Sequence, residues 1–371
     1  MRNERTFSAQ SLEDFATRIL RAVDTDADVA HEVARHLVRA NMSGHDSHGV
    51  IRIPQYLGQI ERGELLPCSR PSIARESATT LVVDAHRGFG HFSTRFALDH
   101  VAAKARQHDT ASAAIRHATH VGRLGEYTER CAELGLVLIM TVGMAGPGVG
   151  GMVIHGGRER FFGANVWSIG VPGLTAPMVF DASMSSISVG KVYIAQAEGA
   201  LLPDGCLVDR DGTPTTDPAD YSAGGAVIPM GGKIAAHKGY GLALASALLG
   251  GLSMIDDDDP SLAGAPVRPG ADPKGRMAGV FMIAINPEAY GGAKVYRSLV
   301  EACLTAAKQV PPAPGFDGVR LPGENASAAR ARAARDGIVL PETTCRDLET
   351  VARRFNVAMP DAAPYARAGT G

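Results

Sequence analysis

The sequence predicts an α/β protein in which helices cover a central mixed sheet and a helical domain is built from both chain ends. Three observations predict this fold. Both ends carry amphipathic helical patterns, the middle alternates apolar strand-like runs with helices, and the 371 residues exceed the size at which one core stops growing. This length is expected for two domains or for one large α/β unit. We expect the division into residues 1–70 plus about 300–371, and residues about 72–299.

Three helices are expected in the first 70 residues. Ser11-Leu12-Glu13-Asp14 resembles a capping box, and Phe15 and Ile19 follow it at helical spacing. A second amphipathic helix is expected over residues 26–42. Pro54 is expected to begin a third helix that runs through Ile60, because proline is tolerated in the first turn of a helix.

Strands and helices alternate in the middle of the chain. The apolar run from Leu136 to Val142 is typical of a strand covered on both faces. A helix rich in Gly and Ala is expected over residues 239–254, buried against the sheet. Other strands are expected at 80–84, 113–116, 178–181 and 279–285, helices at 92–107, 123–134, 295–310, 326–336 and 344–355, and solvated loops at 256–259 and 260–275.

Composition and charge exclude several classes of protein. The net charge is -2 and no basic run is present, which argues against a nucleic-acid or membrane-surface partner. The five cysteines lie far apart without Cys-x-x-Cys spacing, so we expect reduced thiols and no metal site. The first ten residues are polar, so no secretory signal is expected. These features together predict a soluble cytoplasmic protein of the size of an enzyme.

A polar cluster, Ser47, His48, Arg52 and Tyr56, follows the second expected helix. An arginine binds a carboxylate through two parallel hydrogen bonds, while the hydroxyl and imidazole reach the neighbouring oxygen. The cluster therefore indicates a small anionic substrate. A purely structural interpretation, in which the His-Gly pair only caps and turns the chain, remains open.

A second polar group lies at the end of the strand expected at 113–116. His117 and His120 stand where a strand meets a helix, which is where α/β proteins place groups that face a ligand. A neutral imidazole there suits proton transfer near pH 7. The alternative is that either histidine only caps the following helix.

Three further segments contain possible ligand contacts. Gly146 to Gly151 fits G-x-G-x-x-G, but it does not open a helix, so a Rossmann fingerprint is disfavoured. Lys238 precedes a Gly-flanked helix start and is a natural contact for an anion. Asp181 and Lys191 are polar groups where a strand meets a loop, and both are equally explained as turn residues.

Taken in order, these segments resemble the malate/L-lactate dehydrogenase family, which also holds ureidoglycolate and sulfolactate dehydrogenases and cyclic-imine reductases. The matching landmarks span residues about 10 to 340. They are Ser47-His48-Gly49-Val50 with Arg52 and Tyr56, His120-Val121-Gly122, Gly156-Gly157-Arg158-Glu159, Gly163-Ala164-Asn165, Asp181, Gly190-Lys191-Val192, Pro214-Thr215-Thr216-Asp217-Pro218, Lys238-Gly239-Tyr240-Gly241-Leu242, Pro314-Gly315-Phe316 and Leu321-Pro322-Gly323-Glu324.

The resemblance implies an oxidoreductase that uses NAD or NADP without a Rossmann fold, and a homodimer with the site near the subunit interface. The central domain would bind the cofactor, and the terminal domain would serve substrate binding and dimerisation. His120, assisted by His48 and Arg52, would be catalytic. Arg52 would bind the substrate carboxylate, with Ser47, His48 and Tyr56 lining the pocket. The implied cofactor contacts are Asp181, Ala182, Ser183, Lys238, Gly323, Glu324 and His120.

The expected reaction is hydride transfer between NAD(P) and a small 2-hydroxy acid or its 2-keto partner, as for malate or lactate. Departures from the family pattern fall at Ala164-Asn165-Val166, Ala182-Ser183-Met184 and the Gly-rich loop 143–151. They leave NAD versus NADP open. Two alternatives also stay open: an NADPH-dependent reductase of cyclic imines such as piperideine or pyrroline carboxylates, and a non-catalytic ligand-binding homologue.

Overall fold

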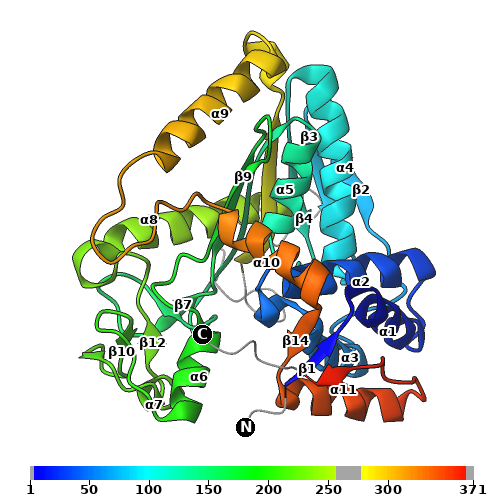
Figure 1. Ribbon diagram of the computed structural model, residues 1–371, viewed down its shortest axis with the longest axis vertical. Helices are drawn as coiled ribbons and strands as arrows, with labels where there is room; N and C mark the ends of the chain where they lie inside the picture. The colour runs from blue at the N-terminus through cyan, green and yellow to red at the C-terminus, as the bar shows by residue number, and fades with distance from the viewer. Residues whose placement is uncertain (1–3, 256–276, 365–371) are drawn as a thin grey trace.

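The computed structural model describes residues 4–255 and 277–364 and contains a central mixed sheet covered by helices, as predicted (Figure 1). The α-helices are α1 (Ala9–Arg21), α2 (Ala27–Met42), α3 (Ile53–Glu61), α4 (Gly90–His108), α5 (Gly125–Glu133), α6 (Val189–Glu198), α7 (Ala219–Ser222), α8 (Gly232–Gly251), α9 (Ala293–Lys308), α10 (Glu324–Asp336) and α11 (Glu342–Arg354). Single 3-10 turns are η1 (Asp46–His48), η2 (Val50–Arg52), η3 (Leu252–Met254) and η4 (Pro287–Tyr290).

The strands are short apart from those at the centre of the sheet. They are β1 (Arg5–Phe7), β2 (Ser72–Glu76), β3 (Thr80–Asp84), β4 (Thr110–Arg116), β5 (Val137–Ala145), β6 (Met152–Val153), β7 (Arg160–Phe162), β8 (Val166–Val171), β9 (Met178–Ala182), β10 (Leu207–Val208), β11 (Pro214–Thr215), β12 (Ala226–Val227), β13 (Met277–Ile285), β14 (Ile338–Leu340) and β15 (Ala363–Pro364).

The two ends of the chain form one layer. β1 lies between β14 and β15 in a small antiparallel sheet, with Phe7 opposite Ile338. Figure 1 shows α1, α2, α3 and α11 gathered around this sheet. Buried side chains of the first 65 residues, such as Phe15 and Leu37, share one core with Leu348 of α11. Burial of this apolar surface holds the termini together. The exact domain boundaries remain a prediction, and α9 contacts the loop at Gly173 rather than this layer.

The main sheet has the order β2-β3-β4-β13-β5-β8-β9 along its central part. β3 and β4 are parallel, whereas β13 is antiparallel to both β4 and β5, and β8 is antiparallel to β5. This mixed order is incompatible with a doubly wound parallel sheet. α4 and α5 cover one face, where Leu138, Met140 and Met282 are buried, and α8 covers the other face.

α8 approaches the sheet closely because glycines line the contact. Gly143 of β5 and Gly279 of β13 are opposite each other on adjacent strands. A Cβ on Gly279 would lie 2.2 Å from the Gly250 carbonyl oxygen of α8, and one on Gly143 would lie 2.3 Å from the Ala247 amide nitrogen. Such separations are below any van der Waals contact, so only glycine fits there. The Gly- and Ala-rich composition of α8 therefore reflects backbone-to-backbone packing.

Most predicted elements are confirmed within one to four residues, and three details are wrong. α1 begins at Ala9, because the Ser8 hydroxyl caps it by accepting a hydrogen bond from the Ser11 amide, so the predicted capping box is not used. α8 begins at Gly232, and its outer face is exposed: Leu248 is 56% exposed. Lys191 lies inside α6. The loops predicted at 256–275 lie outside the described residues.

Among the described residues, no helix combines the length and apolar character needed to cross a membrane. All five cysteines are free of disulfide bonds, with Cys131, Cys206 and Cys345 buried.

We expect Gly250→Ala to lower the free energy of unfolding by about 1–3 kcal/mol, because the added methyl group overpacks the contact between α8 and β13. Gly241→Ala is the matched control on the same helix. A Cβ there meets nothing within 4 Å, so the substitution should stabilise the helix by up to about 1 kcal/mol. Denaturant unfolding of both variants measures the difference. Equal stability of the two would contradict the close-packing interpretation.

Candidate active site

The side chain of Asn41 holds the segment that contains Ser47, His48 and Arg52. Asn41, near the end of α2, donates a hydrogen bond from Nδ2 to Asp46 Oδ1 (2.7 Å) and accepts one from the Val50 amide at Oδ1 (2.9 Å). A Cβ on Gly49 would lie 2.1 Å from Asn41 Oδ1. The chain therefore follows two separate 3-10 turns, η1 and η2, instead of one regular helix.

The loop after β4, which contains His120, is held by α2 as well. The Arg123 amide donates a hydrogen bond to His36 Nε2 (2.9 Å). Gly122 has a positive φ of 76°, and a Cβ there would lie 2.2 Å from the same nitrogen. Because His36 is fully buried and contacts Gly122 and Arg123 of this loop, it fixes the distance between the terminal layer and the loop.

The contacts of Asn41 and His36 bring His48, Tyr56 and His120 together. His48 Nδ1 lies 3.2 Å from His120 Nε2, and the two rings are stacked with a centroid separation of 5.2 Å. Tyr56, on α3 and 1% exposed, places its hydroxyl oxygen 2.7 Å from His120 Nδ1. The terminal layer and the central sheet thus contribute neighbouring groups to a single cluster, as the sequence predicts.

The environment keeps both imidazoles neutral. Burial, with a smaller effect of the Arg52 guanidinium, lowers the pKa of His48 to about 4. Burial also lowers the pKa of His120 well below its usual value, and His91, His48 and Arg52 lower it further. Burial raises the pKa of the Tyr56 phenol, so the phenol keeps its proton. At neutral pH the cluster is a hydrogen-bonded set of uncharged acids and bases.

Arg52 and Ser47 lie at the open side of this cluster. The Arg52 guanidinium donates from Nε to the Ser47 carbonyl oxygen (2.5 Å) and from Nη1 to Gln55 Oε1 (2.6 Å). Ser47 is exposed. The arginine is therefore oriented by neutral oxygens rather than neutralised by a carboxylate, and its positive charge is available to an anionic ligand.

Asp181, at the end of β9, is tied to the loop that contains His120. Its Oδ2 accepts a hydrogen bond from the Gly125 amide at the start of α5 (2.8 Å) and lies 3.5 Å from Arg123 Nε. Burial raises the pKa of this carboxyl, while Arg123 opposes the shift. Arg123 is 4% exposed, and neither its Nε nor its Nη1 has a hydrogen-bond partner. Nη1 is therefore a buried donor without a partner, whereas Nε faces the Asp181 carboxylate.

The other predicted cofactor residues lie along β9. Ala182 is the last residue of β9, and the Ser183 hydroxyl contacts the Ala164 carbonyl and Ser185. Lys238 is exposed near the start of α8. The adjacent Gly239 packs on the backbone of Met230, which in turn bonds to Met184.

Gly323 and Glu324 lie at the opposite end of β9. The Val179 amide donates to the Pro322 carbonyl (3.3 Å), and a Cβ on Gly323 would touch Val179. Glu324 caps α10: its Oε2 accepts from the Leu321 amide (3.0 Å) and from Lys308 Nζ (2.9 Å). Its carboxylate is therefore engaged in local structure.

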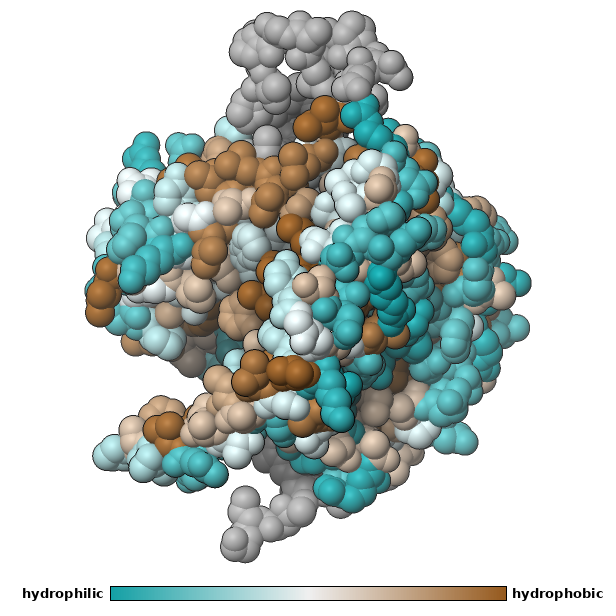
Figure 2. Space-filling model, turned by 90° about the horizontal axis from the view of Figure 1, so that it is seen from above, coloured by the Kyte–Doolittle hydropathy of each residue, from teal (hydrophilic) through white to brown (hydrophobic). Residues whose placement is uncertain are grey.

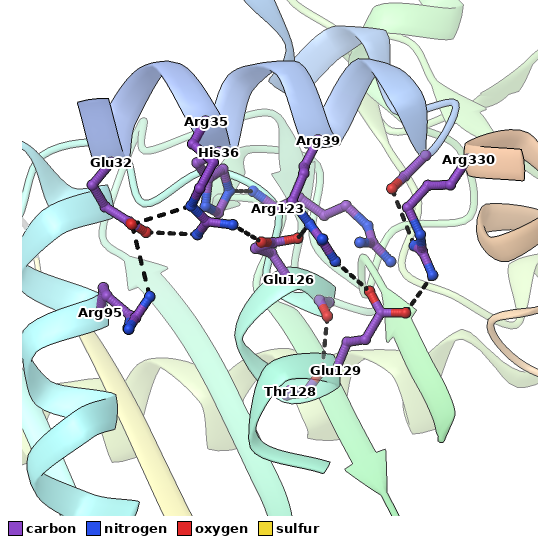
Figure 3. Close-up of polar contacts among 12 residues, drawn as sticks. Glu32, Arg35, His36, Arg39, Arg95, Arg123, Glu126, Thr128, Glu129 and Arg330 are labelled. Atoms are coloured by element: carbon purple, nitrogen blue, oxygen red, sulfur yellow. Dashed lines mark hydrogen bonds and ion pairs between the residues drawn. The ribbon is translucent and has the colours of Figure 1, made fainter. Parts of the chain in front are cut away.

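A network of charged side chains joins α2, α5 and α10 (Figure 3). Glu126 of α5 accepts hydrogen bonds from Arg35 (2.9 Å) and Arg39 (2.8 Å) of α2. Glu129 is bound by Arg39 and by Arg330 of α10. Both carboxylates are less than 10% exposed. The network joins three segments that are distant in sequence, and it fixes α5 beneath the terminal layer.

Two other segments singled out in the sequence lie outside the cluster. His117 has a positive φ of 51°, and its Nδ1 bonds to Asp84 (3.0 Å) at the end of β3, so it holds the strand ends together. The loop Gly146–Gly151 connects β5 to the short strand β6 and opens no helix. The Rossmann interpretation of this loop is therefore excluded.

Three buried residues of the cluster were not foreseen: His36, His91 and Arg123. His36 occupies an apolar-face position of α2, three residues after Val33, and such an inward-facing histidine is the one signal the sequence offers. His91 lies in the first turn of α4, and its Nε2 lies 3.3 Å from the Tyr56 hydroxyl oxygen.

Comparison with known proteins gives a consistent result. A family model described as malate/L-lactate dehydrogenase matches residues 7–349. The chain is 31% identical over 363 residues to L-lactate dehydrogenase of Cupriavidus necator, covering 96% of this chain and 99% of that protein. Among solved structures, sulfolactate dehydrogenase from Methanocaldococcus jannaschii is similar with a TM-score of 0.82 and 28% identity, over 95% of this chain and 98% of that one. Delta1-piperideine-2-carboxylate reductase from Pseudomonas syringae pvar. tomato gives 0.78 and 32%, over 94% and 99%.

We expect acidification from pH 7 to pH 5 to lower the free energy of unfolding. Burial lowers the pKa of His36, His91, His120 and His48 in the folded protein, so the unfolded chain binds more protons below the ordinary value of 6.5. The stability that these neutral rings contribute is complete above that value and is lost as the pH falls. Each contributes up to about 1.4 kcal/mol per pH unit.

Urea unfolding at a series of pH values measures this slope. His36→Gln keeps an acceptor for the Arg123 amide and removes one titrating ring. The change of unfolding free energy with pH should therefore be smaller in this variant by the contribution of one histidine. An unchanged slope in that variant would show that His36 is not held neutral.

Proposed function

The chain belongs to the malate/L-lactate dehydrogenase family and is an oxidoreductase, and we propose that it transfers a hydride between a nicotinamide cofactor and a small 2-hydroxy acid or 2-keto acid. The main support is the contact of His120 with His48 and Tyr56, with the Arg52 guanidinium at the open side of the cluster. That arrangement offers one proton-transfer group and one carboxylate-binding group side by side.

In the proposed mechanism, Arg52 binds the substrate carboxylate, which replaces Gln55 on the guanidinium edge. Ser47, His48 and Tyr56 line the pocket around the adjacent oxygen. In oxidation, the neutral imidazole of His120 accepts the hydroxyl proton while the carbon–hydrogen bond breaks. In reduction, the protonated imidazole returns that proton to the new alkoxide. The nicotinamide, when bound, accepts or supplies the hydride.

We propose that the cofactor lies along β9. Gly323 and Glu324 adjoin Val179 at one end of the strand, and Lys238 lies near Met184 beyond the other. Val179 and Met184 are five residues apart, which corresponds to roughly 16 Å of extended chain at about 3.3 Å per residue. Asp181 and Glu324 are engaged in local structure, so their part would be to position the backbone. The choice between NAD and NADP stays open.

Reduction of a cyclic imine carboxylate is a second candidate. The reductase from Pseudomonas syringae pvar. tomato is 33% identical to this chain, against 31% for the L-lactate dehydrogenase, although its structure is less similar, with a TM-score of 0.78 against 0.82 for the sulfolactate dehydrogenase. A cyclic imine presents the same carboxylate to Arg52 and requires the same proton from His120. Assays with 2-keto acids and cyclic imines, each with NADH and NADPH, distinguish the two substrate classes.

We also propose that the chain forms a homodimer in the cytoplasm. α9 has no buried residue, and Val295 and Leu299 are 60% and 65% exposed. In Figure 2, hydrophobic side chains gather over part of the upper face, and exposed apolar residues of α8 and η3 include Leu248 and Leu252. Exposed apolar surface of this extent is typical of an interface. Sedimentation at the mass of a single 38.8 kDa chain would contradict the dimer.

We expect His120→Ala to lower kcat about 10²- to 10⁴-fold, because the variant lacks the group that exchanges the proton. Binding of the reduced cofactor, followed by its fluorescence, should change little. The conversion of 2-keto acids by wild type and variant is the measurement. His117→Ala is the control, since His117 lies on Asp84, outside the cluster. Near-normal turnover of His120→Ala would remove His120 from the mechanism.

We expect Arg52→Lys to raise KM for the carboxylate substrate by about tenfold or more while kcat falls less. An ammonium group cannot form the two parallel hydrogen bonds that a guanidinium makes to a carboxylate. Steady-state kinetics with the best substrate of the screen measures both constants. An unchanged KM would mean that another group binds the carboxylate.

A further inference from the structure

His91 extends the cluster by one residue into the interior. Its ring is fully buried in the first turn of α4. His91 Nε2 lies 3.3 Å from the Tyr56 hydroxyl oxygen, which in turn lies 2.7 Å from His120 Nδ1. His91, Tyr56, His120 and His48 therefore form one continuous hydrogen-bonded chain that ends at the proposed reaction centre. The mechanism given above assigns no task to His91.

The direction of the hydrogen bonds in this chain is restricted, because the Tyr56 phenol has one proton. It donates either to His91 or to His120 and accepts from the other ring. If Tyr56 donates to His91 Nε2, the neutral His91 ring must carry its proton on Nδ1. That atom is buried and has no hydrogen-bond partner. Because His91 Nδ1 has no partner in either direction, like His36 Nδ1, burial alone does not decide between them.

The position of His91 in α4 favours the opposite direction. The first turn of a helix has unpaired amide groups and a partial positive charge. This environment disfavours a further N–H at Nδ1 and favours a bare nitrogen there. The His91 proton is then on Nε2 and is donated to Tyr56, and the Tyr56 proton is donated to His120 Nδ1. Burial keeps both imidazoles neutral and the phenol protonated, so each group has the proton that this direction requires.

We propose that His91 is a positioning residue that, acting through Tyr56, holds the proton of neutral His120 on Nε2, the nitrogen facing His48 and the substrate. The proposal rests on the proposed role of His120 and adds its resting tautomer. In this state His120 presents an N–H group to the substrate oxygen. A carbonyl oxygen can only accept a hydrogen bond, so the resting site is arranged to receive the 2-keto acid. Oxidation of the 2-hydroxy acid requires the other tautomer, with a bare Nε2, in which the Tyr56 hydroxyl accepts from His120 Nδ1 and donates to His91.

The neighbouring His36 provides a matched control. Its ring is equally buried and lies edge-to-face with His91, with centroids 4.8 Å apart. His36 Nε2 accepts from the Arg123 amide, so His36 carries its own proton on Nδ1 and is not part of the chain through Tyr56. His36→Gln perturbs the same core and should leave the tautomer of His120 unchanged.

The direct test is ¹⁵N NMR of histidine-labelled full-length protein, which distinguishes a protonated ring nitrogen from a bare one. We expect His120 to be protonated on Nε2 in the wild type and in His36→Gln. In His91→Phe, which removes the donor and keeps a ring, and in Tyr56→Phe, that preference should be lost. His91→Gln can place an amide donor near the position of Nε2 and should restore it. A wild-type His120 protonated on Nδ1 would overturn the proposal.

Kinetics provide the second readout. We expect His91→Phe to lower kcat about tenfold, the value of one hydrogen bond, with little change in KM. In a Tyr56→Phe background the same substitution should have no further effect, because the connection to His120 is already broken. An equal loss in both backgrounds would mean that His91 acts only on packing. If His91→Phe does not fold, the NMR comparison of wild type, Tyr56→Phe and His91→Gln still decides the question.

Failure of this proposal is distinguishable from failure of the proposed function. The tautomer of His120 is observed without turnover, whereas the role of His120 is tested by His120→Ala. Normal turnover in His120→Ala would end the proposed mechanism whatever the NMR result.

Discussion

The hydrogen bond from the Arg123 amide to His36 Nε2 is the contact on which the site depends. It joins the terminal helices to the loop that follows β4, and it does so without a charged group. Gly122 makes it possible, because any side chain there would displace the His36 ring. With that distance fixed, Tyr56 and His48 meet His120 from one side and Asp181 meets Arg123 and Gly125 from the other. The site is thus assembled between two parts of the fold rather than within either.

Desolvation then sets the chemistry of the cluster. Four imidazoles and a phenol lie in contact, and burial keeps all of them uncharged at neutral pH. A neutral imidazole can accept or donate a proton depending on its tautomer, so hydrogen-bond direction becomes the controlling property. The nearby positive charges of Arg52 and Arg123 oppose protonation further. An anionic substrate would compensate these charges, which couples substrate binding to proton transfer.

Much of this arrangement could be predicted from the sequence. Strands with continuous apolar runs, such as β5 and β13, and the amphipathic helices were located because their periodicity is local. The group Ser47, His48, Arg52, Tyr56 and His120 was found because the residues lie in short motifs in family order. His36 and His91 were missed because an isolated histidine in a helix has no local signature, and its role arises only from long-range packing. The occupied carboxylates of Asp181 and Glu324 were equally unforeseeable, since their partners are backbone amides and Lys308, a residue of another helix.

The pairing of β1 with β14 has a consequence for how the protein forms during synthesis. Thr6 and Val339 are neighbours across this small sheet, so β1 cannot pair until the distant segment that forms β14 has been made. Glu129 likewise meets Arg330 only after α10 has emerged from the ribosome. Contacts of such long sequence separation form slowly. The amino-terminal helices are therefore the part of a nascent chain that stays exposed longest, and the part that a chaperone would protect.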